Sequence, residues 1–106
     1  MGAFIRIIHD NKTCSIEDVK NLSRTLVEVV STCIGDDDVI VLVENPSVLI
    51  NMEAVEVFIQ VNNQKIDNPD IILVNISKKL SESRDRSDCL INLNLIPVDW
   101  YSRIGI

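Results

Sequence analysis

Residues 15–35 read SIEDVKNLSRTLVEVVSTCIG and place an apolar residue at every third or fourth position. The apolar positions are Ile16, Val19, Leu22, Leu26, Val29, Val30 and Cys33. This spacing is typical of one face of an amphipathic helix. Ser15 offers an N-cap, with Asp18 three residues later as in a capping box, and Gly35 suits a C-cap. The pattern predicts a helix of about 19 residues and about 28 Å, long enough to cover a sheet.

Strands are expected on both sides of this helix. In residues 3–8, Ala3, Ile5 and Ile7 alternate with Phe4, Arg6 and Ile8, as in a half-buried strand. Residues 39–43 form an unbroken apolar run, typical of a strand covered on both faces. A strand, a long helix and a second strand in this order make a right-handed parallel crossover.

The same layout recurs in the second half of the chain. Residues 54–61 alternate as a strand, and residues 62–64 follow as a polar loop. Asn68-Pro69-Asp70 is a strong helix start, and residues 81–88 are charged and loop-like. Residues 91–95 alternate again, and Pro97 is expected to end that strand.

We therefore predict an α/β (α+β) fold in a single domain, residues 1–106. It contains two consecutive β-α-β units, residues 3–44 and 54–97, in a four-stranded mixed sheet with two helices on one face. Residues 45–53, between the two units, are expected to be a connection containing Pro46.

Bulk composition excludes several function classes. A net charge of −6 argues against nucleic acid as a partner, since polyphosphates need a basic face. No apolar run reaches the roughly 18 residues of a membrane span, and no signal peptide is recognisable, so a soluble cytoplasmic protein is expected. The three glycines are far apart, which excludes a phosphate-cradling loop, and a single histidine argues against a Ser-His-Asp triad.

Metals, cofactors and disulfides are not expected. Cys14, Cys33 and Cys89 are odd in number, widely spaced and accompanied by one histidine, so they are interpreted as small apolar fillers. Residues 36–38 are three aspartates that could hold a hard cation, but a solvated turn after the helix is the favoured interpretation. His9 is expected to face solvent or a loop.

The helix-free face of the sheet should be mixed in character. If the strand phases are right, it carries polar side chains together with large apolar ones. These are Arg6, Glu56, Gln60, Asn92 and Asn94, with Phe4, Ile8 and Phe58. Such a face suits burial against copies of itself, with polar groups pairing across the interface, although a merely solvated face remains an alternative.

Four stretches carry a resemblance to a known family. They are Phe4-Ile5-Arg6-Ile7, residues 19–29 (VKNLSRTLVEV), Val55-Glu56-Val57-Phe58 and residues 92–101 (NLNLIPVDWY). The order and lengths of its predicted elements and its opening segment resemble those of the tautomerase / macrophage migration inhibitory factor superfamily. The chain is most similar to a small bacterial tautomerase-like family. The resemblance implies a homotrimer whose sheets line the inside.

That superfamily uses an N-terminal proline as general base or nucleophile, and arginines that hold a substrate carboxylate. This chain departs from the pattern, because residue 2 is Gly2 and strand alignment places Ala3 at the proline's position. Removal of Met1 is expected and would leave the Gly2 amine, which could act as a base or form an imine. Gly2 and Arg6 are therefore the candidate catalytic residues.

The candidate ligand-binding residues are Ala3, Glu56, Trp100, Tyr101 and Arg103. Glu56 is the expected countercharge of Arg6, and the tail residues 100–103 could close a neighbouring subunit's pocket. A small carboxylate is the expected ligand.

Three functional hypotheses stay open. The first is a tautomerase-fold homotrimer that has lost or altered its catalytic amine and binds a small ligand or partner. The second is an active keto-enol isomerase using the Gly2 amine. The third is a ferredoxin-like regulatory or interaction module, whose element order is the same but which favours a short hairpin between the second and third strands.

Overall fold

The computed structural model describes residues 2–10, 12, 14–46, 54–83 and 89–99, except the side chains of Lys65 and Ser83. In chain order its elements are β1 (Ala3–Ile8), α1 (Ile16–Ile34), β2 (Val39–Glu44), β3 (Val55–Asn62), the short 3-10 helix η1 (Asn63–Lys65), α2 (Pro69–Ser83) and β4 (Ile91–Val98). The predicted β-α-β order is confirmed in both halves. None of the described helices combines the length and apolarity needed to cross a bilayer.

Helix α1 begins and ends where its sequence predicts. The Ser15 hydroxyl oxygen accepts a hydrogen bond from the backbone N–H of Asp18 at 3.2 Å, which satisfies one of the first-turn donors. Gly35 lies at φ 67°, a left-handed conformation, and its N–H donates to the carbonyl of Ser31 at 2.9 Å. These local signals fix the length of the helix.

Helix α2 also starts as predicted but ends later. The Asn68 side-chain oxygen accepts from the backbone N–H groups of Asp70 and Ile71, at 3.1 and 3.3 Å. The helix then continues to Ser83, through residues 81–83 that had been expected to be loop. Ahead of it, part of the expected polar loop is wound into η1.

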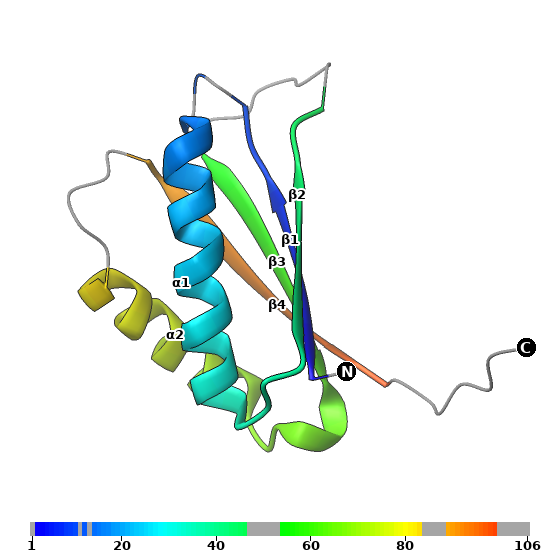
Figure 1. The fold of residues 1–106 in the computed structure, drawn as a ribbon. Helices are drawn as coiled ribbons and strands as arrows, with labels where there is room; N and C mark the ends of the chain where they lie inside the picture. The colour runs from blue at the N-terminus through cyan, green and yellow to red at the C-terminus, as the bar shows by residue number, and fades with distance from the viewer. Residues whose placement is uncertain (1, 11, 13, 47–53, 84–88, 100–106) are drawn as a thin grey trace, which may run out of the picture.

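The sheet has the strand order β2-β1-β3-β4 (Figure 1). Strands β1 and β2 are parallel, β1 and β3 are antiparallel, and β3 and β4 are parallel. The predicted four-stranded mixed sheet is therefore confirmed. Because β1 lies between β2 and β3, these two strands form no hairpin, and the ferredoxin-like alternative is wrong.

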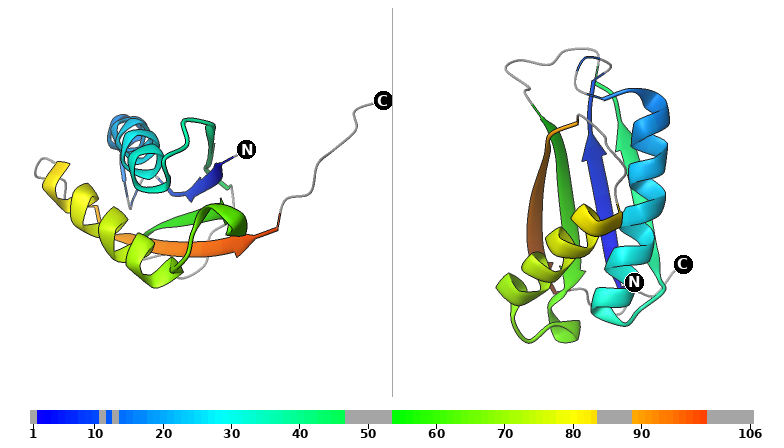
Figure 2. Two further views of the ribbon diagram at one scale, coloured as in Figure 1. Left: turned by 90° about the horizontal axis from the view of Figure 1, so that it is seen from below. Right: turned by 90° about the vertical axis from the view of Figure 1, so that its left-hand side faces the viewer.

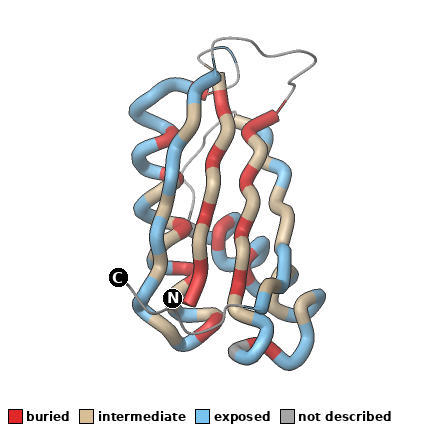
Figure 3. The backbone as a smooth tube through the Cα atoms, turned by 90° about the vertical axis from the view of Figure 1, so that its right-hand side faces the viewer, coloured by how far each residue is buried: buried red, intermediate tan, exposed pale blue. Residues whose placement is uncertain are grey.

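Both helices pack on one face of this sheet, and no described helix lies on the other face (Figure 2). The core lies between the two layers. Its fully buried members come from β1 (Ala3, Ile5, Ile7), β3 (Val55, Val57, Ile59, Val61), α1 (Val19, Leu26, Val30) and α2 (Ile76). Figure 3 views the helix-free side, where buried and half-buried residues alternate along β1 and β3.

Strand β2 was expected to be covered on both faces, and this is wrong for the single chain. Ile40, Leu42 and Val43 are 45%, 46% and 41% exposed. Ile40 and Leu42 lie on the helix-free side of β2, which is an edge strand of the described sheet. Val43 lies on the helix side with Val39 and Val41, and it is exposed near the end of the strand. An unbroken apolar run is thus left half uncovered.

Two further expectations are corrected. Pro97 does not end β4 but lies inside it, opposite Val61. An edge strand tolerates a proline, and one side of β4 has no partner among the described strands. His9 does not face solvent, since it is 1% exposed. Its Nδ1 has no hydrogen-bond partner within the described part of the chain.

Candidate functional site

Gly2 is enclosed at the start of β1. Its backbone N–H donates to the carbonyl of Asp38 at 2.9 Å, and its carbonyl accepts from the N–H of Asn62 at 3.2 Å. A Cβ at this position would lie 2.6 Å from Cγ and 2.8 Å from Cβ of Asp36. A side chain at position 2, including a proline ring, would therefore require the Asp36 segment to move.

Ala3, the other position matched to the catalytic proline, belongs to the core. Its side chain is 0% exposed and points to the helix layer with the other odd-numbered residues of β1. Its N–H also donates to the Asp38 carbonyl, at 3.2 Å. Neither residue therefore presents a side chain to the helix-free side.

The three aspartates beside Gly2 form the predicted turn. The Asp36 side-chain oxygen accepts from the N–H of Asp38 at 2.9 Å, and the Asp37 carbonyl accepts from the N–H of Val39. Their carboxylates do not converge as a metal-ligand group in the described ranges. Residues 36–38 therefore form the connection between α1 and β2.

The helix-free side of the sheet, termed the open face below, consists of three rows in register across β2, β1, β3 and β4. The first row is Ile40, Phe4, Gln60 and Ile96; the second is Leu42, Arg6, Phe58 and Asn94; the third is Glu44, Ile8, Glu56 and Asn92. The row nearest Gly2 is mostly apolar, whereas the row at the far end carries two carboxylates. The mixed character predicted for this face is confirmed.

Arg6 lies in the middle row, between Leu42 and Phe58. Its Nε donates to Oε1 of Glu44 at 2.8 Å, with the two side chains 43% and 32% exposed. The hydrogen bond and the charge of Glu44 raise the pKa of Arg6, against a small opposing effect of burial. Both terminal Nη groups are without a partner among the described residues, so they could receive a carboxylate.

Glu56 is not the countercharge of Arg6, and this correction follows from register. Glu56 faces Asn92 directly on β4, and its two carboxylate oxygens accept from Asn92 at 2.8 Å and Asn94 at 3.3 Å. The Asn94 amide also donates to the carbonyl of Val57 at 3.2 Å. Sequence reasoning missed Glu44 because it ended β2 at residue 43.

The two candidate catalytic residues, both in the described part of the chain, do not meet within one chain. Gly2 and Arg6 are four residues apart on one strand, a distance of about 13 Å along it. Trp100, Tyr101 and Arg103 lie outside the described residues. The described part of β4 ends beside Gly2, because Val98 is opposite Asn62, the residue that hydrogen-bonds to the Gly2 carbonyl.

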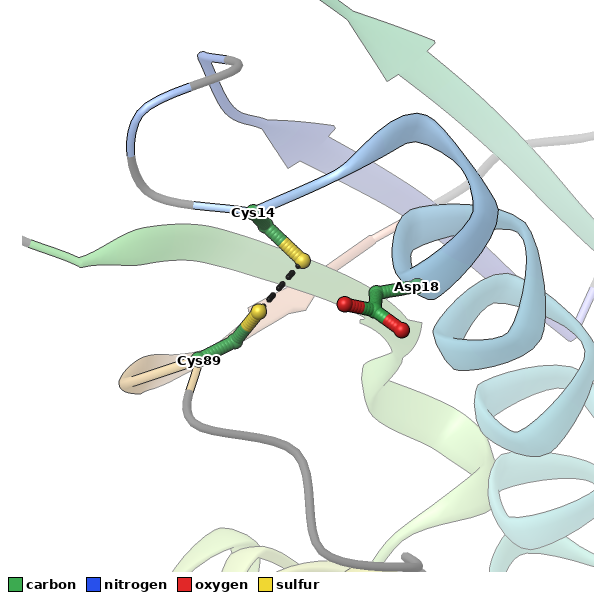
Figure 4. A group of neighbouring side chains, drawn as sticks. All are labelled: Cys14, Asp18 and Cys89. Carbon is green, nitrogen blue, oxygen red and sulfur yellow. Dashed lines mark hydrogen bonds between the residues drawn. The ribbon is translucent and has the colours of Figure 1, made fainter.

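A second cluster, at the opposite end of the sheet, was missed entirely. The ligand atoms of Cys14, Asp18 and Cys89 all lie within 4.8 Å of one another (Figure 4). The cysteines had been interpreted as isolated fillers, because nothing in their spacing indicates that residues 14 and 89 meet. Cys33, on α1, is not part of this cluster.

No protein-family model and no curated protein matches the chain. Several solved structures share its fold, including the following three. Native Ps01740 has 14% identity and a TM-score of 0.58, over 91% of this chain and 94% of that one. Pt0534 inactivated by 2-oxo-3-pentynoate has 15% identity and a TM-score of 0.56, over 91% and 86%. A domain of unknown function (DUF1904) from Sebaldella termitidis has 11% identity and a TM-score of 0.57, over 94% of both. The fold is thus the tautomerase-like one predicted.

Proposed function

We propose that the protein is a homotrimeric member of the tautomerase superfamily that has lost proton-transfer chemistry and binds a small carboxylate between its subunits. The open face carries the proposal. It exposes Ile40, Leu42 and Ile96 by 38–46%, next to half-buried Phe4 and Phe58. Covering this face with other copies would complete the second layer that a two-sided apolar strand such as β2 requires.

The surroundings of position 2 support the loss of proton-transfer chemistry. A superfamily enzyme of this kind needs an unprotonated amine at the start of its first strand. In a chain that begins at Gly2, the amine would lie beside the Asp36 carboxylate, whose Oδ2 is 2.7 Å from the site of a Gly2 Cβ. An adjacent negative charge stabilises the ammonium form, which has no lone pair with which to accept a proton.

Arg6 is the residue that supports carboxylate binding. Its guanidinium lies on the open face between two apolar neighbours, and its Nη groups have no partner among the described residues. A trimer interface would lower the local dielectric and strengthen a bidentate Arg–carboxylate pair. The Glu44 carboxylate competes for the same guanidinium. A ligand therefore binds through the Nη atoms of Arg6 or displaces Glu44.

The assembly is tested with a matched pair of variants. Leu42→Lys places a charge on the open face, and Val74→Lys places one on the exposed surface of α2, where Val74 is 64% exposed. Lysine is well tolerated on edge strands such as β2, and it is a good helix former at the exposed position of Val74 on α2, so both variants should fold. By sedimentation velocity we expect Leu42→Lys to dissociate and Val74→Lys to keep the parental mass. Equal masses for the two variants would contradict burial of the open face.

The chemistry is tested with the compound that inactivates Pt0534. The alkyne of 2-oxo-3-pentynoate is conjugated to its ketone and alkylates nucleophilic amines and thiols. Peptide mapping by mass spectrometry should find no adduct at the N-terminal residue, and phenylpyruvate tautomerisation should be the same with a free or acetylated N-terminus. A stoichiometric N-terminal adduct, with turnover lost on acetylation, would instead support the active-isomerase alternative.

A further inference from the structure

Cys14 and Cys89 meet at the end of the sheet opposite Gly2. Cys14 immediately precedes the N-cap of α1, and Cys89 lies two residues before β4. The Cys89 thiol donates to the sulfur of Cys14, with 2.6 Å between the two Sγ atoms (Figure 4). The strand directions bring them together, because β1 ends where the antiparallel β3 and its parallel neighbour β4 begin.

We propose that Cys14 and Cys89 form a reversible thiol–disulfide site that exchanges with a low-molecular-weight disulfide such as oxidised glutathione. The site lies at the other end of the molecule from Gly2 and is independent of the proposed carboxylate binding. The bond would join the two β-α-β units across 75 positions of sequence.

The distance between the sulfurs favours a disulfide over a metal centre. A disulfide bond is about 2.05 Å long, so the two atoms need to approach by roughly 0.5 Å. Two thiolates on one tetrahedral zinc, each at about 2.3 Å from it, would instead lie about 3.8 Å apart. Asp18 is the only other donor in the described cluster, and a closed structural zinc site needs four.

Access to the pair is unequal. Cys14 is 4% exposed, whereas Cys89 is only half-buried and lines a hollow of about 190 Å³ between α2 and β4. Ser77 and Ser81 line the same hollow. A small disulfide can therefore reach Cys89 first, and Cys14 is positioned to resolve the product.

Disulfide formation proceeds through two thiol–disulfide exchange steps. The Cys89 thiolate attacks one sulfur of oxidised glutathione, forming a mixed disulfide and releasing one glutathione thiolate, which takes up a proton. Cys14 then loses its proton to solvent and attacks the Cys89 sulfur, which forms the intramolecular bond and releases the second glutathione. The protein loses two electrons and two protons, and oxidised glutathione is reduced to two thiols.

The test uses the reduced full-length chain in buffers with different ratios of oxidised to reduced glutathione. Trypsin places the cysteines in separate peptides, residues 13–20, 25–65 and 87–103. After acid quenching and alkylation, we expect a cross-linked product of peptides 13–20 and 87–103 with two hydrogen masses missing. Cys33→Ser should give the same product at the same midpoint ratio, which makes it the matched control.

Two variants resolve the order of events. Cys14→Ser should accumulate a glutathione adduct on residue 89, and Cys89→Ser should leave residue 14 a thiol. Removing the Asp18 charge with Asp18→Asn should speed oxidation, because a nearby carboxylate opposes the negative charge of an attacking thiolate. Closing so long a loop should raise the Tm of the oxidised wild-type protein by roughly 10 °C.

Three outcomes would overturn the proposal. One is an oxidised wild-type chain that carries only glutathione adducts, and another is a cross-link that includes peptide 25–65. The third is one zinc ion bound per reduced chain that protects Cys14 and Cys89 from alkylation and weakens in Asp18→Asn, which would assign a metal site instead. Peptide mapping of the wild-type protein decides the matter even if a serine variant fails to fold.

Discussion

Arg6 on β1 and Glu44 on β2 form an ion pair across the open face, with Nε of the arginine 2.8 Å from Oε1 of the glutamate. The pair is diagonal, because Arg6 is in register with Leu42 and Glu44 with Ile8. A carboxylate already occupies one edge of the guanidinium. Any carboxylate ligand must share Arg6 with Glu44 or replace it.

Replacing Glu44 should therefore tighten ligand binding. In Glu44→Gln, the charged competitor is gone, and we expect affinity for phenylpyruvate to rise only roughly two- to fivefold, since a solvent-exposed ion pair is a weak competitor. Arg6→Gln should abolish binding. Isothermal titration calorimetry measures both.

The control is Glu56→Gln, because the Glu56 carboxylate is held by Asn92 and Asn94 and not by Arg6. Its affinity for phenylpyruvate should equal that of the parent protein. If Glu56→Gln bound phenylpyruvate more tightly and Glu44→Gln bound it with unchanged affinity, the ion pair of Arg6 would be misassigned.

The close approach of Gly2 to Asp36 should make position 2 intolerant of a side chain. Gly2→Ala forces a Cβ to within 2.6 Å of the Asp36 carboxyl carbon, and overpacking of this kind costs about 1–3 kcal/mol. Urea unfolding measures the loss. In an Asp36→Gly background, the same Gly2→Ala change should cost almost nothing, because the clashing atoms are absent. Equal costs in both backgrounds would mean that Asp36 is not the obstacle.

Cys33 should be alkylated slowly at neutral pH. Burial raises its pKa above the ordinary 9.0, while the charge of Lys79 lowers it to a lesser extent. Because the thiolate is the reactive form, a raised pKa keeps Cys33 in the thiol form as pH rises. In a Cys14→Ser/Cys89→Ser variant, the rate of iodoacetamide alkylation should still be climbing above pH 9. A plateau below pH 9 would contradict the raised pKa.

The elements were predictable because their signals are local. The Ser15 and Gly35 caps lie within a few residues of the backbone groups that they satisfy, so they fixed α1 at both ends. Alternation likewise placed Arg6 and Glu56 on the helix-free side. His9 continues the alternating series Ala3, Ile5 and Ile7. Had the predicted strand been extended by one residue, the same alternation would have predicted that His9 is buried.

The predictions that failed concern contacts between distant parts of the chain. The order of strands decides that Glu44, not Glu56, reaches Arg6, and periodicity within a strand carries no information about its neighbours. Cys14 and Cys89 are brought together by the sheet's connectivity across 75 positions. The exposure of Leu42 depends on what covers the open face, which the sequence of one chain does not specify.

The central claim is that copies of the chain cover the open face, and the mass of the unmodified protein in solution tests it most directly. Sedimentation velocity or light scattering at micromolar concentration should give three times the 11.9 kDa of one chain. A single species of 11.9 kDa would leave Leu42, Phe58 and Arg6 in water on a lone protomer, and the proposed binding site between subunits would not exist.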